Sequence, residues 1–235
     1  KWSYYFSEGQ MSSSPNDNAD SFKVFSYTKK SYWNYFDRMF EQRRLSDKVP
    51  MSRSNMMGTH NSYNVGHYRN LASALGPNQA VTISEQLQLG ARFLEFDLHN
   101  AGGLRACHAT DCSNSLTRIE VPRLMAEIHN YLKGNNPNDF VVLYIENEMQ
   151  TQGDYDYLKQ IIERGLGDYV YKPTVSSGSC QNTPYDNSID EMRATGKRVL
   201  VLGVGCSNEV INSGLNQWAF KTGHNSKDVD LSDVA

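Results

Sequence analysis

The stretch ARFLEFDL, residues 91–98, decides the fold class of this chain. It is an almost unbroken apolar run, which is typical of a parallel strand buried on both faces. Two further runs have the same character, FVVLYIEN at residues 140–147 and KRVLVLGVG at residues 197–205. Patterns typical of helices lie between these runs. The sequence therefore predicts an α/β fold.

Two shorter segments complete the predicted strands, NMMGTHN at residues 55–61 and LRACH at residues 104–108. A helix is predicted at residues 84–90, which begin with Ser84 and end with Gly90, a cap at each end. Helices are also predicted at residues 118–134 and 153–167, where apolar side chains recur on one face. The unit of strand, polar loop and helix repeats from residue 55 onward.

Polar and ionisable residues gather near the ends of these strands. Side chains alternate along a strand, so Glu95 and Asp97 share one face. The full set of such residues is His60, Asn61, Glu95, Asp97, His108 and Glu146. We expect four successive strands to deliver them at or near their carboxyl ends, as in the active site of a (β/α) barrel. An open doubly wound sheet binds ligands mainly at one crevice, so the barrel is favoured.

Each of these residues also has a purely structural interpretation. A histidine at a strand end is usually structural or solvated, and a glutamate in an apolar run can pair with an arginine. Arg92 and Arg105 are the candidate partners. That interpretation has to hold for every member of the set at the same end of successive strands, so we favour a functional site.

The chemistry of the set is specific. Oxygen donors on Asn61, Glu95, Asp97 and Glu146 suit a hard cation, calcium or magnesium. Without a cation, carboxylates packed together raise one another's pKa values. Two histidines suit general acid–base catalysis near neutral pH. Together these features predict metal-assisted phosphoryl transfer or phosphodiester cleavage.

Composition excludes some other classes. A net charge of −3 argues against a nucleic-acid binder. No apolar run approaches the roughly 20 residues of a transmembrane helix. No signal peptide is visible, and Lys1 suits a mature or trimmed start.

Four cysteines favour disulfides and a secreted, extracellular protein. We predict bridges from Cys107 to Cys112 and from Cys180 to Cys206. A zinc site formed by Cys107, His108 and Cys112 is disfavoured, because the paired spacing of a zinc ribbon is absent.

The first 50 residues differ in composition from the rest. We expect residues 1–50 to be an extension and residues 51–235 to be the barrel. Within the extension, Trp33, Phe36 and Phe40 fall on one face of a predicted helix at residues 31–45. We favour a helix that covers an open end of the core over one that lies on a membrane surface.

The motifs GTHNSY (residues 58–63), QLQLGARFLEFDL (86–98), His108 and VVLYIEN (141–147) together resemble the catalytic X region of phosphatidylinositol-specific phospholipase C. The resemblance covers residues about 50 to 150. It implies a distorted TIM barrel that cleaves phosphoinositides at a membrane surface. The inositol 2-hydroxyl attacks phosphorus, and the products are diacylglycerol and a cyclic inositol phosphate.

Asn61 and Asp97 resemble the calcium-dependent branch, because the metal-free branch has Asp and Arg at these places. The resemblance implies that His60 stabilises and protonates the phosphoryl centre and that His108 is the general acid. It implies calcium ligands at Asn61, Glu95, Asp97 and Glu146. Glu95, or a carboxylate near it, is the expected base.

A complete barrel has eight strands in about 250 residues, whereas five strands are predicted after residue 55. We therefore expect only the N-terminal part of the barrel, completed by a second chain or a further segment. The headgroup pocket is not assigned. Two alternatives stay open: a glycerophosphodiester or sphingomyelinase D type of phosphodiesterase, and a non-catalytic lipid- or calcium-binding relative.

Overall fold

The computed structural model describes residues 44–68, 77–108, 112–113, 118–134, 138–176 and 178–221. The predicted helix at residues 31–45 lies outside this part of the chain except for its last two positions.

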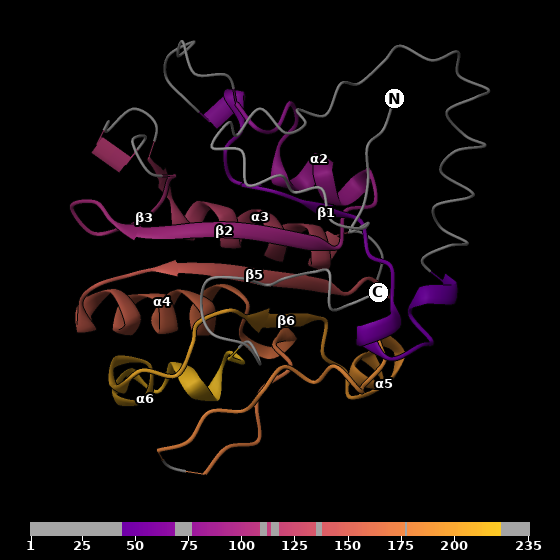
Figure 1. Ribbon diagram of the computed structural model, residues 1–235. Helices are drawn as coiled ribbons and strands as arrows, with labels where there is room; N and C mark the ends of the chain where they lie inside the picture. The colour runs from indigo at the N-terminus through magenta and orange to yellow at the C-terminus, as the bar shows by residue number, and fades with distance from the viewer. Residues whose placement is uncertain are drawn as a thin grey trace.

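A mixed sheet forms the centre of the fold (Figure 1). Its strands are β1 (Gly58–Thr59), β2 (Phe93–Asn100), β3 (Leu104–Ala106), β4 (Ile119–Glu120), β5 (Val141–Glu148) and β6 (Val199–Leu202). Their order is β4-β3-β2-β5-β6, and β1 also pairs with β2. β1, β2, β5 and β6 run parallel to one another, as a (β/α) barrel requires. All five predicted strands are present, whereas β4 was not predicted.

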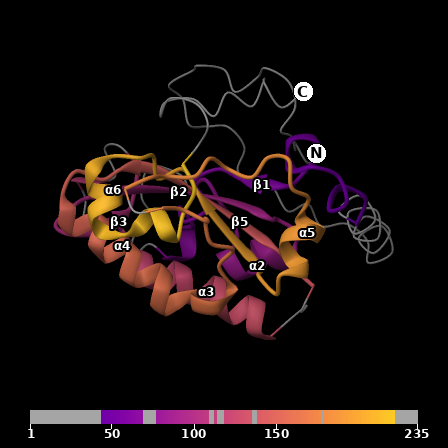
Figure 2. The ribbon, with the colours of Figure 1, turned by 90° about the horizontal axis from the view of Figure 1, so that it is seen from below.

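Helices follow the strands as the pattern predicts. They are α2 (Ile83–Gln88), α3 (Val121–Gly134), α4 (Gln152–Gly165), α5 (Ile189–Ala194) and α6 (Asn208–Ser213), with 3-10 turns η1 (Met51–Arg53), η2 (Gly66–Tyr68), η4 (Gly167–Tyr169) and η5 (Leu215–Gln217). Figure 2 shows α3 and α4 along one face of the sheet. The first predicted helix matches α2, the second α3 and the third α4. Among described residues, no helix is both long and apolar enough to span a membrane.

The expectation that the LRACH strand is a further barrel strand is wrong. β3 runs antiparallel to β2, with Leu98 opposite Ala106. Three residues separate the two strands, and a parallel connection needs about a dozen or more. Gly102 and Gly103 have φ angles of 74° and 107°, which permit the tight reversal.

Two apolar clusters lie on opposite faces of the sheet. On the outer face, Leu94, Phe96 and Leu98 of β2 pack with residues of α2, α3 and α4. On the inner face, Val142 of β5 and Leu200 and Leu202 of β6 form a second cluster. The inner face is therefore apolar toward the start of these strands.

Irregular segments cover this inner cluster. Met51 N–H donates to the Asn187 carbonyl at 2.9 Å, and Phe220 N–H donates to the Val201 carbonyl at 2.9 Å. Phe220 thereby pairs with the edge of β6 that is turned away from β5. Both Met51 and Phe220 belong to the inner cluster. The described residues form part of a distorted (β/α) barrel with an apolar floor.

Candidate active site

Strand register brings the predicted carboxylates together. Asp97 of β2 lies directly opposite Glu146 of β5, and Glu95 lies opposite Tyr144. These residues share the inner face, beyond the apolar floor formed by Phe93, Val142 and their neighbours. Asp97 is almost fully buried. Two adjacent parallel strands therefore deliver three acidic groups to one face, from the middle of β2 and the carboxyl half of β5.

β1 places His60 and Asn61 beside Glu95. Gly58 pairs with Phe93 and Thr59 with Leu94, so the chain leaves β1 at the level of Glu95. The Nε2 atom of His60 lies 3.8 Å from Glu95 Oε2. The Asn61 N–H donates to the same oxygen at 3.4 Å. The structure thus brings His60, Asn61 and Glu95 together.

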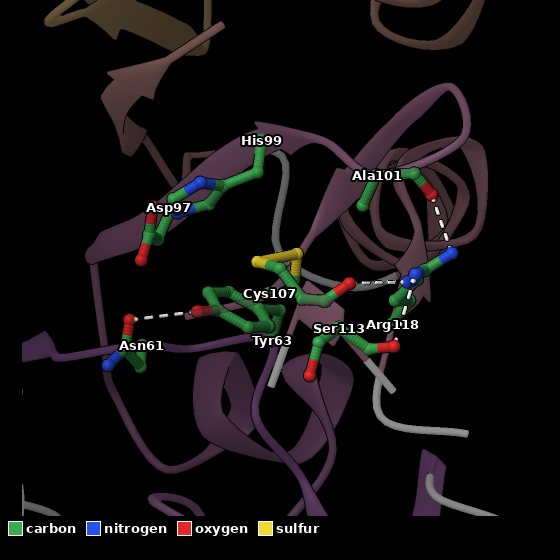
Figure 3. The surroundings of a disulfide bond; sticks show 9 residues. Asn61, Tyr63, Asp97, His99, Ala101, Cys107, Ser113 and Arg118 are labelled. Carbon is green, nitrogen blue, oxygen red and sulfur yellow. Dashed lines mark hydrogen bonds and ion pairs between the residues drawn. A yellow bond between two sulfur atoms is a disulfide. The ribbon is translucent and has the colours of Figure 1, made fainter. Parts of the chain in front are cut away.

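Asn61 has an unusual backbone. Its φ of 46° is the one positive value outside glycine among the described residues. Asparagine tolerates this left-handed conformation better than most residues. The Tyr63 hydroxyl donates to Asn61 Oδ1 at 3.1 Å (Figure 3), while the buried Asn61 Nδ2 has no hydrogen-bond partner in the described structure. Such a conformation, held by a buried tyrosine, is typical of functional positions.

His108 reaches the cluster through the hairpin rather than at the end of a parallel strand. After β3, the Cys107 N–H donates to the Asp97 carbonyl at 3.1 Å. The next residue, His108, comes close enough for its charge to act on Glu146. The β2–β3 hairpin, rather than a further parallel strand, thus carries His108 toward the acidic cluster.

Every other ionisable residue of the predicted set contributes to the pKa shift of Glu146. Its pKa is raised to about 7, mainly by burial and also by the charges of Asp97 and Glu95, while His108 and His60 oppose the shift. The predicted acidic cluster and both histidines therefore interact electrostatically at one end of the sheet.

Sequence reasoning missed His99. Its Nε2 lies 2.7 Å from Asp97 Oδ1, although neither atom makes a well-directed hydrogen bond within the described residues. Contact with Asp97 raises the pKa of His99, burial opposes the shift, and the charges of Asp97, Glu148 and Glu146 add to it. Extending the alternation of β2 by two residues beyond Asp97 would have placed His99 on the same face.

The two arginines considered as structural partners are engaged elsewhere. Arg92 pairs with the buried Asp139 at 2.9 Å, and Arg105 pairs with Glu120 at 3.0 Å. Their charges therefore do not account for Glu95, Asp97 or Glu146. This weakens the purely structural interpretation of the acidic cluster.

The donor set fits calcium by its chemistry. Calcium prefers carboxylate and amide oxygens, and Asp97 Oδ1 is buried without a hydrogen bond in the described structure. As the described side chains stand, no three His, Cys, Asp or Glu residues form a ready metal centre. Asp97 Oδ1 instead faces His99.

Both predicted disulfides are confirmed. Cys107 is joined to Cys112 and Cys180 to Cys206, and the described chain has no free cysteine. The first bridge lies beside His108 in the sequence, with Tyr63, Asp97 and His99 around it (Figure 3).

Comparison with known proteins identifies relatives of this chain. The sequence model of the family described as Rv2075c PI-PLC-like domain matches residues 22–230. Two curated relatives, uncharacterized proteins Rv2075c and MT2135 from two Mycobacterium tuberculosis strains, are each 29% identical over 183 residues. The aligned region covers 69% of this chain but only 38% of each relative.

A solved structure has a similar fold. The phosphatidylinositol-specific phospholipase C from Listeria monocytogenes aligns with a TM-score of 0.52 and 19% sequence identity. The alignment covers 76% of this chain and 61% of that one.

Proposed function

Because the chain belongs to the Rv2075c PI-PLC-like domain family, we propose that it cleaves phosphatidylinositol-type phospholipids with the help of calcium. The products are diacylglycerol and a cyclic inositol phosphate. The proposal rests on one observation: β1, β2 and β5 bring His60, Asn61, Glu95, Asp97 and Glu146 into one cluster. The aligned region is 38% of the relatives' length, so the proposal concerns this part of them alone.

His60 is the group that we assign to the phosphoryl oxygens. Its contact with Glu95, 3.8 Å between Nε2 and Oε2, orients the imidazole. In this role His60 stabilises and protonates the charge that develops on the phosphoryl group during attack.

His108 is assigned as the general acid. Diacylglycerol leaves as an alkoxide, which is a poor leaving group without a proton. The hairpin brings His108 to the cluster from a different strand than His60, so the two histidines can serve different oxygens of one phosphodiester.

The oxygen donors of Asn61, Glu95, Asp97 and Glu146 would hold calcium, which when bound lowers the pKa of the inositol 2-hydroxyl. Glu95 accepts the Asn61 N–H and lies near His60, so it is the carboxylate best placed to take the hydroxyl proton.

The setting that we propose is extracellular, at the surface of a phospholipid membrane. The two disulfides support it, because such bridges persist mainly in oxidising compartments.

A sphingomyelinase D type of reaction is the second candidate. The bridge from Cys107 to Cys112 favours it, because the CHATDC loop resembles a cysteine-containing loop of those enzymes. The two reactions differ in which side of the phosphorus is cleaved.

The test is product analysis by mass spectrometry. The protein is incubated with defined vesicles of phosphatidylinositol, phosphatidylcholine and sphingomyelin in calcium. We expect diacylglycerol from phosphatidylinositol alone. A phosphorylated lipid product would favour the second candidate, and no product from any lipid would favour a non-catalytic relative.

A further inference from the structure

The proposed acid lies just outside the sheet. β3 ends at Ala106, so His108 is beyond the last residue whose backbone belongs to a strand. A strand of three residues is a weak anchor for a catalytic imidazole. Something besides β3 must hold His108 at the cluster, because misplacing a catalytic group by about 1 Å can cost a hundredfold in rate.

The disulfide restrains the chain immediately next to His108. Cys107 is fully buried, and its N–H donates to the Asp97 carbonyl at 3.1 Å. It is joined to Cys112 at a sequence separation of 5. One end of the bridge is therefore fixed to the strand that carries Asp97.

Arg118 fixes the other end. Its Nε donates to the Cys112 carbonyl at 2.7 Å, and Nη1 donates to the Ala101 carbonyl at 2.7 Å. Nη2 reaches the Ser113 carbonyl at 3.4 Å. Figure 3 shows this guanidinium between the turn at Ala101 and the bridged segment. Arg118 thus ties the far end of the bridge to the β2–β3 turn.

We propose that the Cys107–Cys112 disulfide, anchored by Arg118, positions His108 as the general acid. The inference rests on the proposed function, since it assigns a device to the same site. A dithiol reductant breaks the bridge by transferring two electrons and two protons. The protein gains two thiols, and the reductant is oxidised to its own disulfide. Activity should then fall.

The second disulfide is a matched control. Cys180 and Cys206 are separated by 26 residues, and Cys180 packs against the outer apolar cluster. Closing a longer loop removes more entropy from the unfolded chain, so this bridge should stabilise the fold more than the short one. Neither cysteine of this bridge is adjacent in sequence to a candidate site residue. We therefore expect removal of the Cys180–Cys206 bridge to cost more stability, and removal of the Cys107–Cys112 bridge to cost more activity.

The experiment compares two double variants, Cys107→Ser with Cys112→Ser and Cys180→Ser with Cys206→Ser. Turnover and KM are measured on phosphatidylinositol vesicles with calcium, and stability is measured by urea unfolding. We expect the first variant to lose about a hundredfold in kcat with little change in KM. The second should lose more stability and keep kcat within about threefold of the wild type.

Two further measurements distinguish a loss of positioning from misfolding. Arg118→Lys keeps the charge but cannot serve three carbonyls, so kcat should fall by about tenfold at nearly unchanged stability. The variant lacking Cys180 and Cys206 should still lose activity reversibly with a dithiol. Normal kcat in the variant lacking Cys107 and Cys112, or kcat losses that follow stability losses, would overturn the proposal.

An NMR readout separates this inference from the proposed function. We expect the His108 ring resonances to be dispersed in the oxidised protein and to move toward random-coil positions without the Cys107–Cys112 bridge. Unchanged resonances would reject positioning even if lipid is cleaved. An inactive wild type with the expected shift would reject the proposed function and leave the positioning role supported.

Discussion

At the scale of single residues, protons and calcium should compete for the same groups. Burial and the charges of Asp97 and Glu95 hold the pKa of Glu146 at about 7, and contact with Asp97 raises the pKa of His99. A carboxylate binds calcium only when deprotonated, and a protonated His99 occupies Asp97 Oδ1.

Calcium affinity should therefore increase from pH 6 to pH 8. We expect about a tenfold gain, since one proton near pKa 7 has to leave Glu146. Titration calorimetry in buffers of different ionisation enthalpy should also detect proton release. Glu146→Gln is the control, with weaker binding that varies less with pH. An affinity that is constant over this range would contradict the assignment.

Stability without metal should show the opposite trend. The folded pKa of Glu146 is raised from 4.5 to about 7, so its contribution is complete below pH 4.5 and is lost as pH rises through 7. The loss by pH 8 should be about 1–2 kcal/mol, because partial exposure screens the effect. Urea unfolding in EDTA measures it. Glu146→Gln should remove most of this slope, and a wild-type slope retained in that variant would assign it to other groups.

The two histidines should differ in their response to the leaving group. His108→Ala should cost about two to four orders of magnitude in rate with a lipid substrate. It should cost much less with a nitrophenyl phosphodiester, whose phenolate leaves without a proton. His60→Ala should slow both reactions, since charge on phosphorus has to be stabilised in each. Equal losses for His108→Ala on the two substrates would show that it is not the acid.

Much of the candidate site could be predicted, because period-two alternation fixes which side chains share a face. It placed Glu95 and Asp97 on one face of β2, and the observed register sets Asp97 opposite Glu146, which alternation alone does not specify. The same rule would have found His99. Arg118 could not be predicted, because its partners are backbone carbonyls, which leave no side-chain pattern in the sequence.

At the scale of elements, parallel strands were predicted well and their connections less well. The long apolar runs became β2, β5 and β6, since burial on both faces leaves a strong signal. The direction of β3 was missed, although the short connection through Gly102 and Gly103 favours a hairpin. The short elements β4, α5 and α6 carry too few residues to show a period.

Gly203 should be essential to the packing of β6 against β5. A Cβ there would collide with the Ile145 carbonyl and the Tyr144 ring, at a φ of 98°. Gly203→Ala should therefore cost about 3 kcal/mol or more in the free energy of unfolding.

Gly205→Ala is the matched control for Gly203→Ala. Its φ is 73°, but nothing lies within 4 Å of the added carbon, so the cost should be about 1 kcal/mol. Urea unfolding compares the two variants. Equal losses would mean that backbone strain rather than collision decides the outcome at Gly203.

At the scale of the whole molecule, the barrel is partial but its inner floor is covered. The sequence predicted too few strands for a complete barrel, and the described residues agree. It did not predict that Met51 and Phe220 would cover the inner cluster, because these contacts join segments far apart in the chain. The polar site lies beyond this floor, along the middle of β2 and the carboxyl half of β5.

The central claim is that this site cleaves phosphatidylinositol with calcium, and phosphorus NMR of the reaction tests it most directly. The wild type and His60→Ala are compared on phosphatidylinositol micelles, each in calcium and in EDTA. We expect a cyclic inositol phosphate signal to grow with the wild type in calcium alone. Equal formation of that product in EDTA, or its formation by His60→Ala at the wild-type rate, would rule out calcium-dependent cleavage at this site.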